Sequence, residues 1–405
     1  MHANKKVVLI IGGNIETVPA VKIAKKFGYI TVITDDNINA PAKKFSDYFL
    51  KVSTYDIDQS IKMVVNFNKK IKIDAVMSMT TDVPLTVSKI ASKLKLPNIP
   101  INTTKIFTDK YLMKKKLKQI RIPIPKFYLI KNFNDLKKKI QILDICIIKP
   151  VDSRGARGVY IINHNTKNLK TLYEKSKSFS SKKKIIVEEF LKGQQLSTET
   201  IISNYKVKTI GISDRNYEFI KRFQPNVIEN GSDLPSKFHN KYIKEIDKIV
   251  RKISIKLNIK NGTMKGDLVI HKNKIYVIEF APRLSGGYFS SIMIPKSSEV
   301  NLIELAIKIH LGEKINLNQI NYKLKKYVTQ RFFFPKPGIV KKIRINKNLL
   351  KKRGVEYFQC YLKKGDKINN LTDHTGRAGQ VITSSNSKKV AIELANKICN
   401  SIKFN

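Results

Sequence analysis

The stretch "VIEFAPRLSGG", residues 277–287, places a carboxylate at the end of an apolar run and an arginine four residues beyond it. A second apolar run, "MKGDLVI" at residues 264–270, also contains a single acid, Asp267. The short segment "HKNK" lies between the two runs, so we predict two adjacent antiparallel β-strands joined by a turn. Such strands can bring Asp267 and Glu279 onto one face of a sheet.

These two carboxylates indicate a metal site. Neighbouring carboxylates repel each other unless a cation lies between them. Mg²⁺ suits this position because it takes oxygen ligands and binds substrate phosphates, and Mn²⁺ is a second candidate. Lys265 lies two residues before Asp267, so its side chain points to the same face. The alternative is a buried salt-bridge network, which is costly to build without a function.

A glycine-rich loop follows a lysine in "IIKPVDSRGARGV", residues 147–159. Lys149 ends an apolar strand, and Ser153, Gly155 and Gly158 follow it. Glycines allow backbone N–H groups to converge on an anion, and the lysine adds a positive charge, so the pattern suits a polyphosphate. The spacing differs from GxxxxGK[ST], which excludes a P-loop. A β-hairpin with an exposed lysine is the alternative.

The run "IIVEEFLKGQQLSTE", residues 185–199, is a strand that ends in Glu188, Glu189, Phe190 and Leu191. A flat aromatic base can lie against such a strand end, with main-chain groups reading its edge and apolar side chains on either side. A solvated strand end is the alternative.

The first hundred residues predict a parallel sheet with helices on its faces. Strand-like runs alternate with segments of helical periodicity, beginning with "KVVLIIGG" at residues 6–13. The Gly12-Gly13 turn resembles half of a dinucleotide fingerprint, but Thr17 occupies the position of its last glycine. Close packing of strand against helix explains the glycines equally well, so NAD binding is disfavoured.

Two proline-punctuated segments, "LPNIPIN" at residues 96–102 and "FFFPKPG" at residues 332–338, mark domain boundaries. Between them a basic helix is expected within "FTDKYLMKKKLKQI", residues 107–120, with Thr108 as its N-cap. The tail predicts short strands and a terminal helix over "SKKVAIELANKIC".

Taken together and in order, these features resemble the ATP-grasp superfamily, specifically its carboxylate–amine ligases. A lysine precedes a glycine-rich loop, a strand ends in "EEFL", and two late acids close with E-x-x-P-R. The segment "DHTGRAGQVI", residues 373–382, is similar to the small C-terminal domain of L-amino-acid ligases. The resemblance covers essentially the whole chain. It implies an α/β and α+β fold with a Rossmann-like pre-grasp domain over 1–102, an ATP-grasp domain over 103–330 and a small C-terminal α+β domain over 331–405.

The resemblance implies how ATP is held. Lys110 and Lys149 match the lysines that contact the α- and β-phosphates. The segment from Ser153 through Gly155 to Gly158 matches the mobile loop that covers the phosphates. Glu188 and Leu191 match readers of the adenine edge, Leu191 through its backbone N–H, and Glu189 belongs to the same strand end.

The resemblance also implies the reaction centre. Asp267 and Glu279 match the Mg²⁺ ligands, and Arg283 matches the arginine that steadies the transferred phosphoryl group and the acyl-phosphate. Lys265 stands where some members carry an arginine near the transition state. Ser285 and Gly286 are expected to form a flexible rim for the carboxylate substrate. Two further candidates for substrate contact are Asp82 and Arg377.

Two positions depart from the family pattern. The ribose-binding Glu is replaced by Gln195, which is a neutral acceptor. The usual Asn two residues after the second metal ligand is replaced by Ala281, so water has to supply that oxygen. Enzymes that carboxylate aminoimidazole ribonucleotide also tend to have Ala in E-x-A-P-R, but their next residues are rich in His and Asn.

The implied activity is ATP-dependent ligation. A carboxylate attacks the γ-phosphate, an acyl-phosphate forms, and an amine displaces phosphate to give an amide or peptide bond. A carboxylating ligase that works through carboxyphosphate is one alternative, and a nucleotide-binding protein without catalysis is another. The expected partners are a small-molecule carboxylate and amine. The oligomeric state stays open, with a homodimer as the assembly common among the enzymes it resembles.

Composition limits the other classes. The chain has 405 residues and a net charge of +47, which raises the alternative of a polyanion-binding module. The basic residues are mostly lysines scattered through all regions, so we expect no specific nucleic-acid partner. No apolar run approaches the roughly 20 residues that span a bilayer, so no membrane partner is expected. Three cysteines without metal-ligand spacing suit a reducing cytoplasm.

Overall fold

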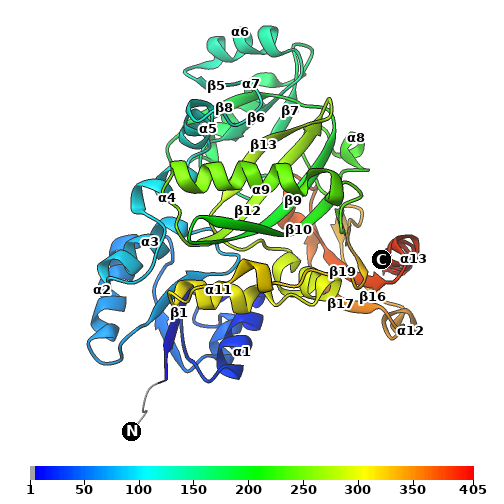
Figure 1. The fold of residues 1–405 in the computed structure, drawn as a ribbon. Coiled ribbons are helices and arrows are strands. Elements are labelled where there is room, and N and C mark those ends of the chain that lie inside the picture. The colour runs from blue at the N-terminus through cyan, green and yellow to red at the C-terminus, as the bar shows by residue number, and fades with distance from the viewer. Residues whose placement is uncertain (1–4) are drawn as a thin grey trace.

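The computed structural model describes residues 5–405 (Figure 1). Its N-terminal region contains a parallel sheet of four strands in the order β3-β2-β1-β4. The elements of this region are β1 (Val7–Ile11), α1 (Val18–Lys26), β2 (Ile30–Asp35), β3 (Tyr48–Lys51), α2 (Ile57–Asn68), β4 (Ala75–Ser78) and α3 (Pro84–Lys93). All of β1 is buried because α1 covers one face of the sheet while α2 and α3 cover the other. The predicted parallel sheet is therefore confirmed.

Helix α11 (Leu302–His310) comes from a distant part of the chain and completes the core of this N-terminal region. Its buried residues join those of β1 and α1 in one hydrophobic cluster. The N-terminal sheet therefore shares a core with the later part of the chain, which fixes its position relative to the site described below.

A smaller antiparallel sheet follows, with strands in the order β5-β8-β6-β7. Its elements are β5 (Phe127–Ile130), α6 (Phe133–Leu143), β6 (Cys146–Pro150), β7 (Tyr160–Ile162), α7 (Leu169–Ser178) and β8 (Ile185–Glu189). Ile148 and Val187 pack in one cluster with residues of α6 and α7. Because side chains alternate along a strand, Lys149 and Glu188 project from the opposite face.

The largest sheet is antiparallel and has eight strands in the order β13-β12-β9-β10-β11-β14-β19-β17. These strands are β9 (Gln194–Ser203), β10 (Lys206–Asn216), β11 (Gly231–Leu234), β12 (Gly262–His271), β13 (Lys274–Ala281), β14 (Tyr327–Phe333), β17 (Val355–Cys360) and β19 (Gly379–Ser385). The predicted boundary between residues 330 and 331 lies within β14, so one continuous sheet runs through that position.

The other helices cover or connect these sheets. They are α4 (Ile101–Phe107), α5 (Lys110–Gln119), α8 (Ile220–Phe223), α9 (His239–Lys256), α10 (Ile294–Ser298), α12 (Lys347–Leu350) and α13 (Lys388–Ser401). The remaining short elements are η1 (Ile15–Thr17), η2 (Pro41–Phe45), η3 (Phe289–Met293), η4 (Leu317–Gln319), η5 (His374–Gly376), β15 (Gly338–Ile339), β16 (Ile343–Arg344), β18 (Lys367–Ile368) and β20 (Lys403–Phe404).

The predicted N-cap at Thr108 is wrong. Thr108 ends α4, and Asp109 caps α5 instead. The Asp109 carboxylate accepts hydrogen bonds from the backbone N–H groups of Tyr111 and Leu112, at 3.0 and 3.1 Å. A carboxylate is favoured at this position because it also faces the positive end of the helix dipole. The cap makes Lys110 the first residue of α5.

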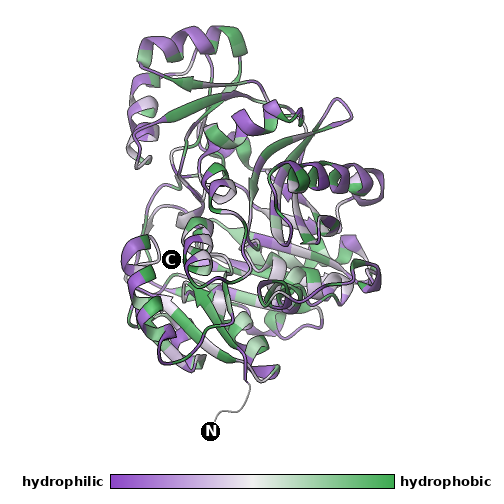
Figure 2. Cartoon of the chain, turned by 60° about the vertical axis from the view of Figure 1, so that its left-hand side comes forward, coloured by the Kyte–Doolittle hydropathy of each residue, from purple (hydrophilic) through white to green (hydrophobic). Residues whose placement is uncertain are grey.

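Hydrophilic residues cover the outward faces of the helices in every region, while hydrophobic residues follow the strands (Figure 2). This distribution agrees with lysines spread over solvated surfaces. Within residues 5–405, no helix combines the length and the apolar character that crossing a bilayer requires.

Candidate active site

A cavity of about 430 Å³ lies between the small sheet and the large sheet. The structure brings nearly all the predicted site residues to its wall. They are Asp82, Lys110, Lys149, Ser153, Gly155, Glu188, Glu189, Leu191, Gln195, Lys265, Asp267, Glu279, Arg283, Ser285, Gly286 and Arg377. Gly158 is the exception: a Cβ there would lie 3.0 Å from side-chain atoms of Pro150 and Phe179, so this glycine allows close packing outside the cavity wall.

The predicted hairpin carries both acids. β12 and β13 pair antiparallel with Asp267 opposite Glu279, and a tight turn at Lys272 and Asn273 joins them, with φ of 47° and 60°. The register shifts immediately after this pair, so Ile278 is an extra residue in β13. Such a bulge re-aims neighbouring side chains, and Ile278 and Glu279 both line the cavity.

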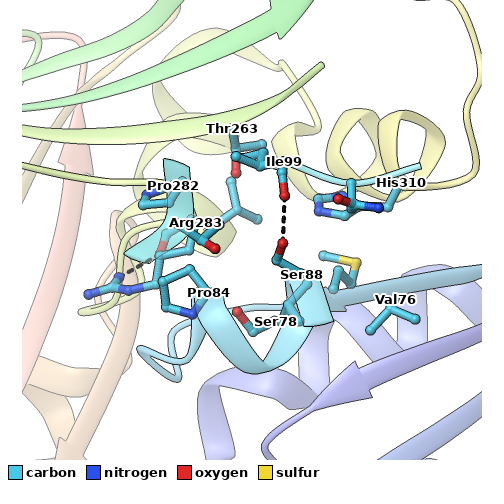
Figure 3. Close-up of a pocket in the computed structure, with 14 residues that line it drawn as sticks. Val76, Ser78, Pro84, Ser88, Ile99, Thr263, Pro282, Arg283 and His310 are labelled. Carbon is cyan, nitrogen blue, oxygen red and sulfur yellow. Dashed lines mark hydrogen bonds between the residues drawn. The ribbon is translucent and has the colours of Figure 1, made fainter. Parts of the chain in front are cut away.

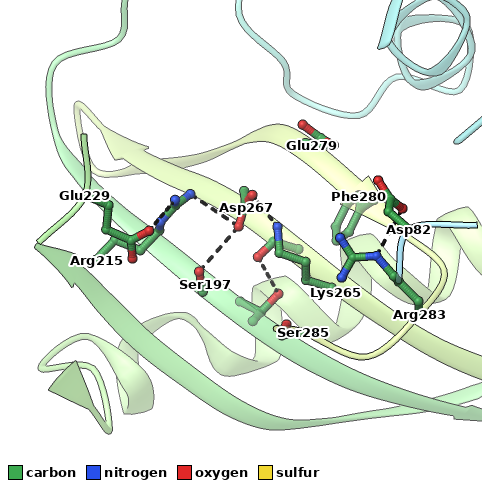
Figure 4. A network of polar contacts seen from close by, with 12 residues as sticks. Asp82, Ser197, Arg215, Glu229, Lys265, Asp267, Glu279, Phe280, Arg283 and Ser285 are labelled. Carbon is green, nitrogen blue, oxygen red and sulfur yellow. Dashed lines mark hydrogen bonds and ion pairs between the residues drawn. The ribbon is translucent and has the colours of Figure 1, made fainter. Parts of the chain in front are cut away.

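Each acid of the hairpin has cationic neighbours. Asp267 contacts the Lys265 ammonium, and its Oδ1 lies 3.4 Å from Nη1 of Arg215 (Figure 4). Glu279 Oε1 lies 3.7 Å from Nζ of Lys110. Burial alone would raise the pKa of Asp267, but the charges of Lys265 and Arg215 hold that pKa well below its usual range. The Asp267 carboxylate is therefore ionised, which is the form that binds a cation.

Two carboxylates facing one cavity fit Mg²⁺, which commonly uses one or two protein carboxylates together with substrate phosphates and water. Among residues 5–405, no group of three or more Asp, Glu, His or Cys side chains is placed to hold a metal. Ala281, which replaces the usual Asn, is buried opposite Lys265 and offers no side-chain oxygen. Asp267 and Glu279 thus would hold the ion, with its other ligands coming from phosphate and water.

The opposite wall contains a buried cluster of two lysines and one glutamate. The Glu188 carboxylate contacts the Lys149 ammonium, and its Oε2 lies 2.6 Å from Nζ of Lys114. We predicted that Glu188 reads the adenine edge, but its carboxylate is engaged by these lysines. Reading of a base would therefore fall to main-chain groups of Glu189 and Leu191.

Lys114 was missed by the sequence analysis. It is fully buried, and burial lowers its pKa to about 8, although the charge of Glu188 opposes that shift. Lys114 follows Lys110 by one helical turn, so both project from the same face of α5. That spacing was the available signal, hidden within the run of lysines at residues 114–116.

Lys110 holds the glycine-rich loop, which we define as residues 151–159. The backbone N–H of Lys110 donates to Val151 O at 2.8 Å, and Lys110 Nζ donates to Ser153 O at 2.6 Å. Gly155 has a φ of 60°, and its carbonyl accepts from the backbone N–H of His374 at 3.0 Å. The loop is therefore fixed at both sides of the cavity.

Arg283 pairs with Asp82 rather than with an acid of the hairpin. Its Nε donates to Asp82 Oδ1 at 3.0 Å (Figure 4), and its Nη1 donates to the backbone carbonyl of Leu284 at 2.8 Å. Asp82 Oδ2 also lies 3.2 Å from Nε of Arg154 in the glycine-rich loop. Burial opposes ionisation of Asp82, yet the charges of Arg283 and Arg154 lower its pKa to about 2.

Two acids that the sequence analysis did not select hold the rim at residues 285–288. Glu199 is buried under the rim and accepts from the Ser285 N–H at 2.9 Å. Glu16 accepts from the Tyr288 N–H at 3.1 Å, and Gly287 O accepts from Gln330 at 2.7 Å. Residues from three regions therefore fix the predicted substrate rim.

A further ionic cluster of the cavity wall surrounds Glu229 and adjoins Asp267 through Arg215. Arg215 Nη2 donates to Glu229 Oε2 at 2.8 Å (Figure 4). Arg377 Nη2 donates to the backbone carbonyl of Glu229 at 2.7 Å. The Arg377 guanidinium stacks on Phe332, with 3.7 Å to the ring centroid. Arg215 is a further residue that sequence reasoning missed, because its partner Asp267 lies on another strand, β12, far along the chain.

A separate small cavity of about 20 Å³ lies beside the backbone of Arg283 (Figure 3). Its wall includes Ser88, whose hydroxyl donates to Ile99 O at 2.6 Å, and His310. The volume suits about one water molecule, so this cavity is not a substrate site.

Family models match the chain in three consecutive parts. Residues 8–96 match a PylC-like N-terminal domain, residues 107–287 match an ATP-grasp domain, and residues 331–405 match L-amino acid ligase C-terminal domain 2.

Among curated proteins, the carbamoyl phosphate synthase large chain of Clostridium botulinum (strain Langeland / NCTC 10281 / Type F) is 28% identical over 332 residues. The match covers 77% of this chain and 30% of that protein, so the chain spans under a third of the length of this relative.

Solved structures share the fold over almost the entire chain. The L-amino acid ligase from Bacillus licheniformis has a TM-score of 0.84 at 19% identity, covering 99% of this chain and 98% of the other. Phosphoribosylglycinamide synthetase from Anaerococcus prevotii has a TM-score of 0.74 at 19% identity, covering 99% and 100%. N5-carboxyaminoimidazole ribonucleotide synthetase from Thermotoga maritima has a TM-score of 0.72 at 18% identity, covering 98% and 99%. The predicted fold class is confirmed.

Proposed function

We propose that this chain, which belongs to the ATP-grasp superfamily, is an ATP-dependent ligase that joins a carboxylate to an amine and releases ADP and phosphate. One observation carries the proposal. A single cavity has Lys110 and Lys149 on the side of the small sheet, and Asp267, Glu279 and Arg283 on the side of the large sheet. This arrangement suits a polyphosphate whose terminal phosphoryl group lies next to a metal-binding pair of acids.

The reaction would proceed in two displacements. A carboxylate oxygen of the substrate attacks the γ-phosphorus, the bond to the bridging oxygen of ADP breaks, and an acyl-phosphate forms. The amine nitrogen then attacks the acyl carbon, phosphate leaves with the bonding electron pair, and the amine loses a proton to solvent or phosphate. Neither displacement requires a protein nucleophile, so positioning and electrostatics supply the catalysis.

The chain's own residues divide this work. Lys110 and Lys149 would neutralise the α- and β-phosphates, and Arg283 would neutralise the transferring group. Mg²⁺ bound by Asp267 and Glu279 would supply Lewis-acid stabilisation of the phosphate charge. The glycine-rich loop would exclude water from the acyl-phosphate.

A carboxylating ligase is the second candidate. Ala281 in E-x-A-P-R favours it, and a named synthetase of N5-carboxyaminoimidazole ribonucleotide shares the fold. Bicarbonate-dependent release of phosphate from ATP would separate this candidate from amide formation. The match of the tail to an L-amino acid ligase domain favours the amide-forming reaction.

The domain limits, the cofactors, the cellular location and the assembly are proposed as well. We propose that the units are residues 1–102, 103–330 and 331–405, and that ATP and Mg²⁺, or Mn²⁺, are used. Three free cysteines support a reducing, cytoplasmic setting. A homodimer is the proposed assembly.

The test is a screen for phosphate release with ATP, Mg²⁺ and pairs of candidate acids and amines. Once a productive pair is found, Glu279→Gln should reduce turnover by at least about 100-fold, as expected for loss of transition-state charge stabilisation. The control is Glu299→Gln, which removes an exposed carboxylate that pairs with Lys325 at 3.1 Å. Normal turnover by Glu279→Gln would contradict the assignment of the site.

A further inference from the structure

We infer that Asp82 is a positioning residue that ties the glycine-rich loop to the arginine at the reaction centre. Asp82 follows β4 in the N-terminal region, and its two oxygens have different partners. Oδ1 accepts from Arg283 Nε at 3.0 Å, and Oδ2 lies 3.2 Å from Arg154 Nε in the loop. One carboxylate from the N-terminal region thus connects two cationic residues of the cavity wall.

The loop contacts the N-terminal region at a second point. The Arg154 guanidinium also lies over the Tyr55 ring, 4.5 Å from its centroid. Its side chain remains 34% exposed, so its contacts with Asp82 and Tyr55 can break and re-form without unfolding the surrounding core. On the other side, the His374 N–H donates to Gly155 O. The loop is therefore held over the cavity from two sides, and Asp82 supplies the ionic contact at one of them.

The contact to Arg283 gives Asp82 a second effect. Asp82 engages Nε, and Leu284 O engages Nη1, so the plane of the guanidinium is fixed. Arg283 lines the cavity together with Glu279, which lies within the hairpin that carries the acids. The fixed plane leaves Nη2 to meet an incoming phosphoryl group. Asp82 thereby couples loop closure, which excludes water, to the orientation of the arginine that stabilises charge.

Hydrogen exchange tests the loop contact without any substrate. In Asp82→Asn, the backbone amides of residues 152–159 should exchange about fivefold faster than in the unaltered protein, the factor expected for loss of a partly exposed ion pair. Arg154→Met should give at least as large an increase, because it also removes the contact with Tyr55. The double variant should show no increase beyond Arg154→Met alone, because the ion pair is already lost in that variant.

The matched control removes another ion pair between the N-terminal region and the later chain. Glu313 Oε1 lies 3.2 Å from Nζ of Lys6, and both side chains are partly exposed. Glu313→Gln should leave exchange in residues 152–159 unchanged. Equal loop exchange in Asp82→Asn and Glu313→Gln would overturn the inference.

The coupling to Arg283 is tested by the ratio of ADP to amide, and this arm rests on the proposed function. Asp82→Asn should release more than one ADP per amide, because water reaches the acyl-phosphate when the loop opens. A residue that only stabilised the fold would lower both products equally, so an unchanged ratio overturns the coupling. If the unaltered protein makes no amide with any pair, the proposed function fails, while the exchange experiment still decides the role of Asp82 at the loop.

Discussion

The two walls of the cavity differ in how deeply their charged side chains are buried. On the small-sheet wall, Lys114 and Lys149 flank Glu188, and these three side chains are between 0% and 5% exposed. On the large-sheet wall, Asp267 and Glu279 occupy paired positions of β12 and β13, and their side chains are 15% and 28% exposed. The first wall is closed to solvent and carries an excess of positive charge. The second wall is more open and carries one carboxylate on each strand of the hairpin.

This difference gives the two walls different roles. The small-sheet wall is a prearranged structural cluster, whereas the large-sheet wall is a site that can bind ligands. Glu188 is the shared partner of both lysines, so removing Glu188 leaves two buried ammonium groups without a counter-charge. Asp267 and Glu279 have cationic neighbours but retain access to the cavity, so a bound cation can replace or join those neighbours. The small-sheet wall should therefore dominate stability, whereas the large-sheet wall should dominate activity.

The largest expected effect is on stability. Glu188→Gln should lower the free energy of unfolding by about 3 kcal/mol, because it leaves two buried ammonium groups without a counter-charge. Glu279→Gln should change it by less than about 1 kcal/mol, because that ion pair is partly exposed. Urea unfolding of both variants measures the contrast.

A second variant shows whether the loss arises from the buried charge. Glu188→Gln combined with Lys114→Met should be more stable than Glu188→Gln alone, because the double variant has one fewer uncompensated ammonium group. Equal destabilisation by Glu188→Gln and Glu279→Gln would contradict the distinction between the walls.

A pH effect should follow from Lys114. Burial lowers its pKa to about 8, whereas a lysine in an unfolded chain titrates near 10.4. Between these values the unfolded chain binds a proton that the folded chain does not, so the contribution of Lys114 to the free energy of unfolding rises with pH. Below pH 8 both states are protonated, and the contribution is flat. From pH 8 to about 9.5, the unaltered protein should gain about 2 kcal/mol relative to Lys114→Met.

The matched control for this pH effect is Lys118→Met, which alters an exposed lysine of the same helix. The difference in the free energy of unfolding between Lys118→Met and the unaltered protein should stay constant over the same pH range. A constant difference for Lys114→Met as well would show that Lys114 titrates normally in the folded protein.

Local patterns were enough to predict much of the fold. The hairpin of β12 and β13 was predicted because both strands and their turn lie within twenty consecutive residues. The N-terminal parallel sheet was predicted from strand and helix alternation. The cap at α5 was wrong by one residue because Thr108 and Asp109 are adjacent capping residues, and the local sequence does not decide which one ends α4.

The site residues that were missed have partners far away in the chain. Lys114 meets Glu188, and Arg215 meets Asp267, through sheets whose packing no local pattern reveals. Glu188 and its partner Lys149 were both identified as site residues, but their pairing with each other and with Lys114 was not. One local signal was available: Met113, Lys114 and Leu117 are all buried, which places Lys114 on the inward face of α5.

The smallest predicted effect is on the affinity for ATP. Gln195 lines the cavity at the position where the family pattern has a glutamate. Gln195→Glu should tighten ATP binding about fivefold, because a charged acceptor forms a stronger hydrogen bond with a ribose hydroxyl than an amide does. Calorimetric titration with ATP and Mg²⁺ measures the change, and Gln119→Glu, at an exposed position of α5, controls for added negative charge. Weaker binding by Gln195→Glu would mean that residue 195 faces the phosphates, where a negative charge is repelled, and the ribose would then have to lie elsewhere in the cavity.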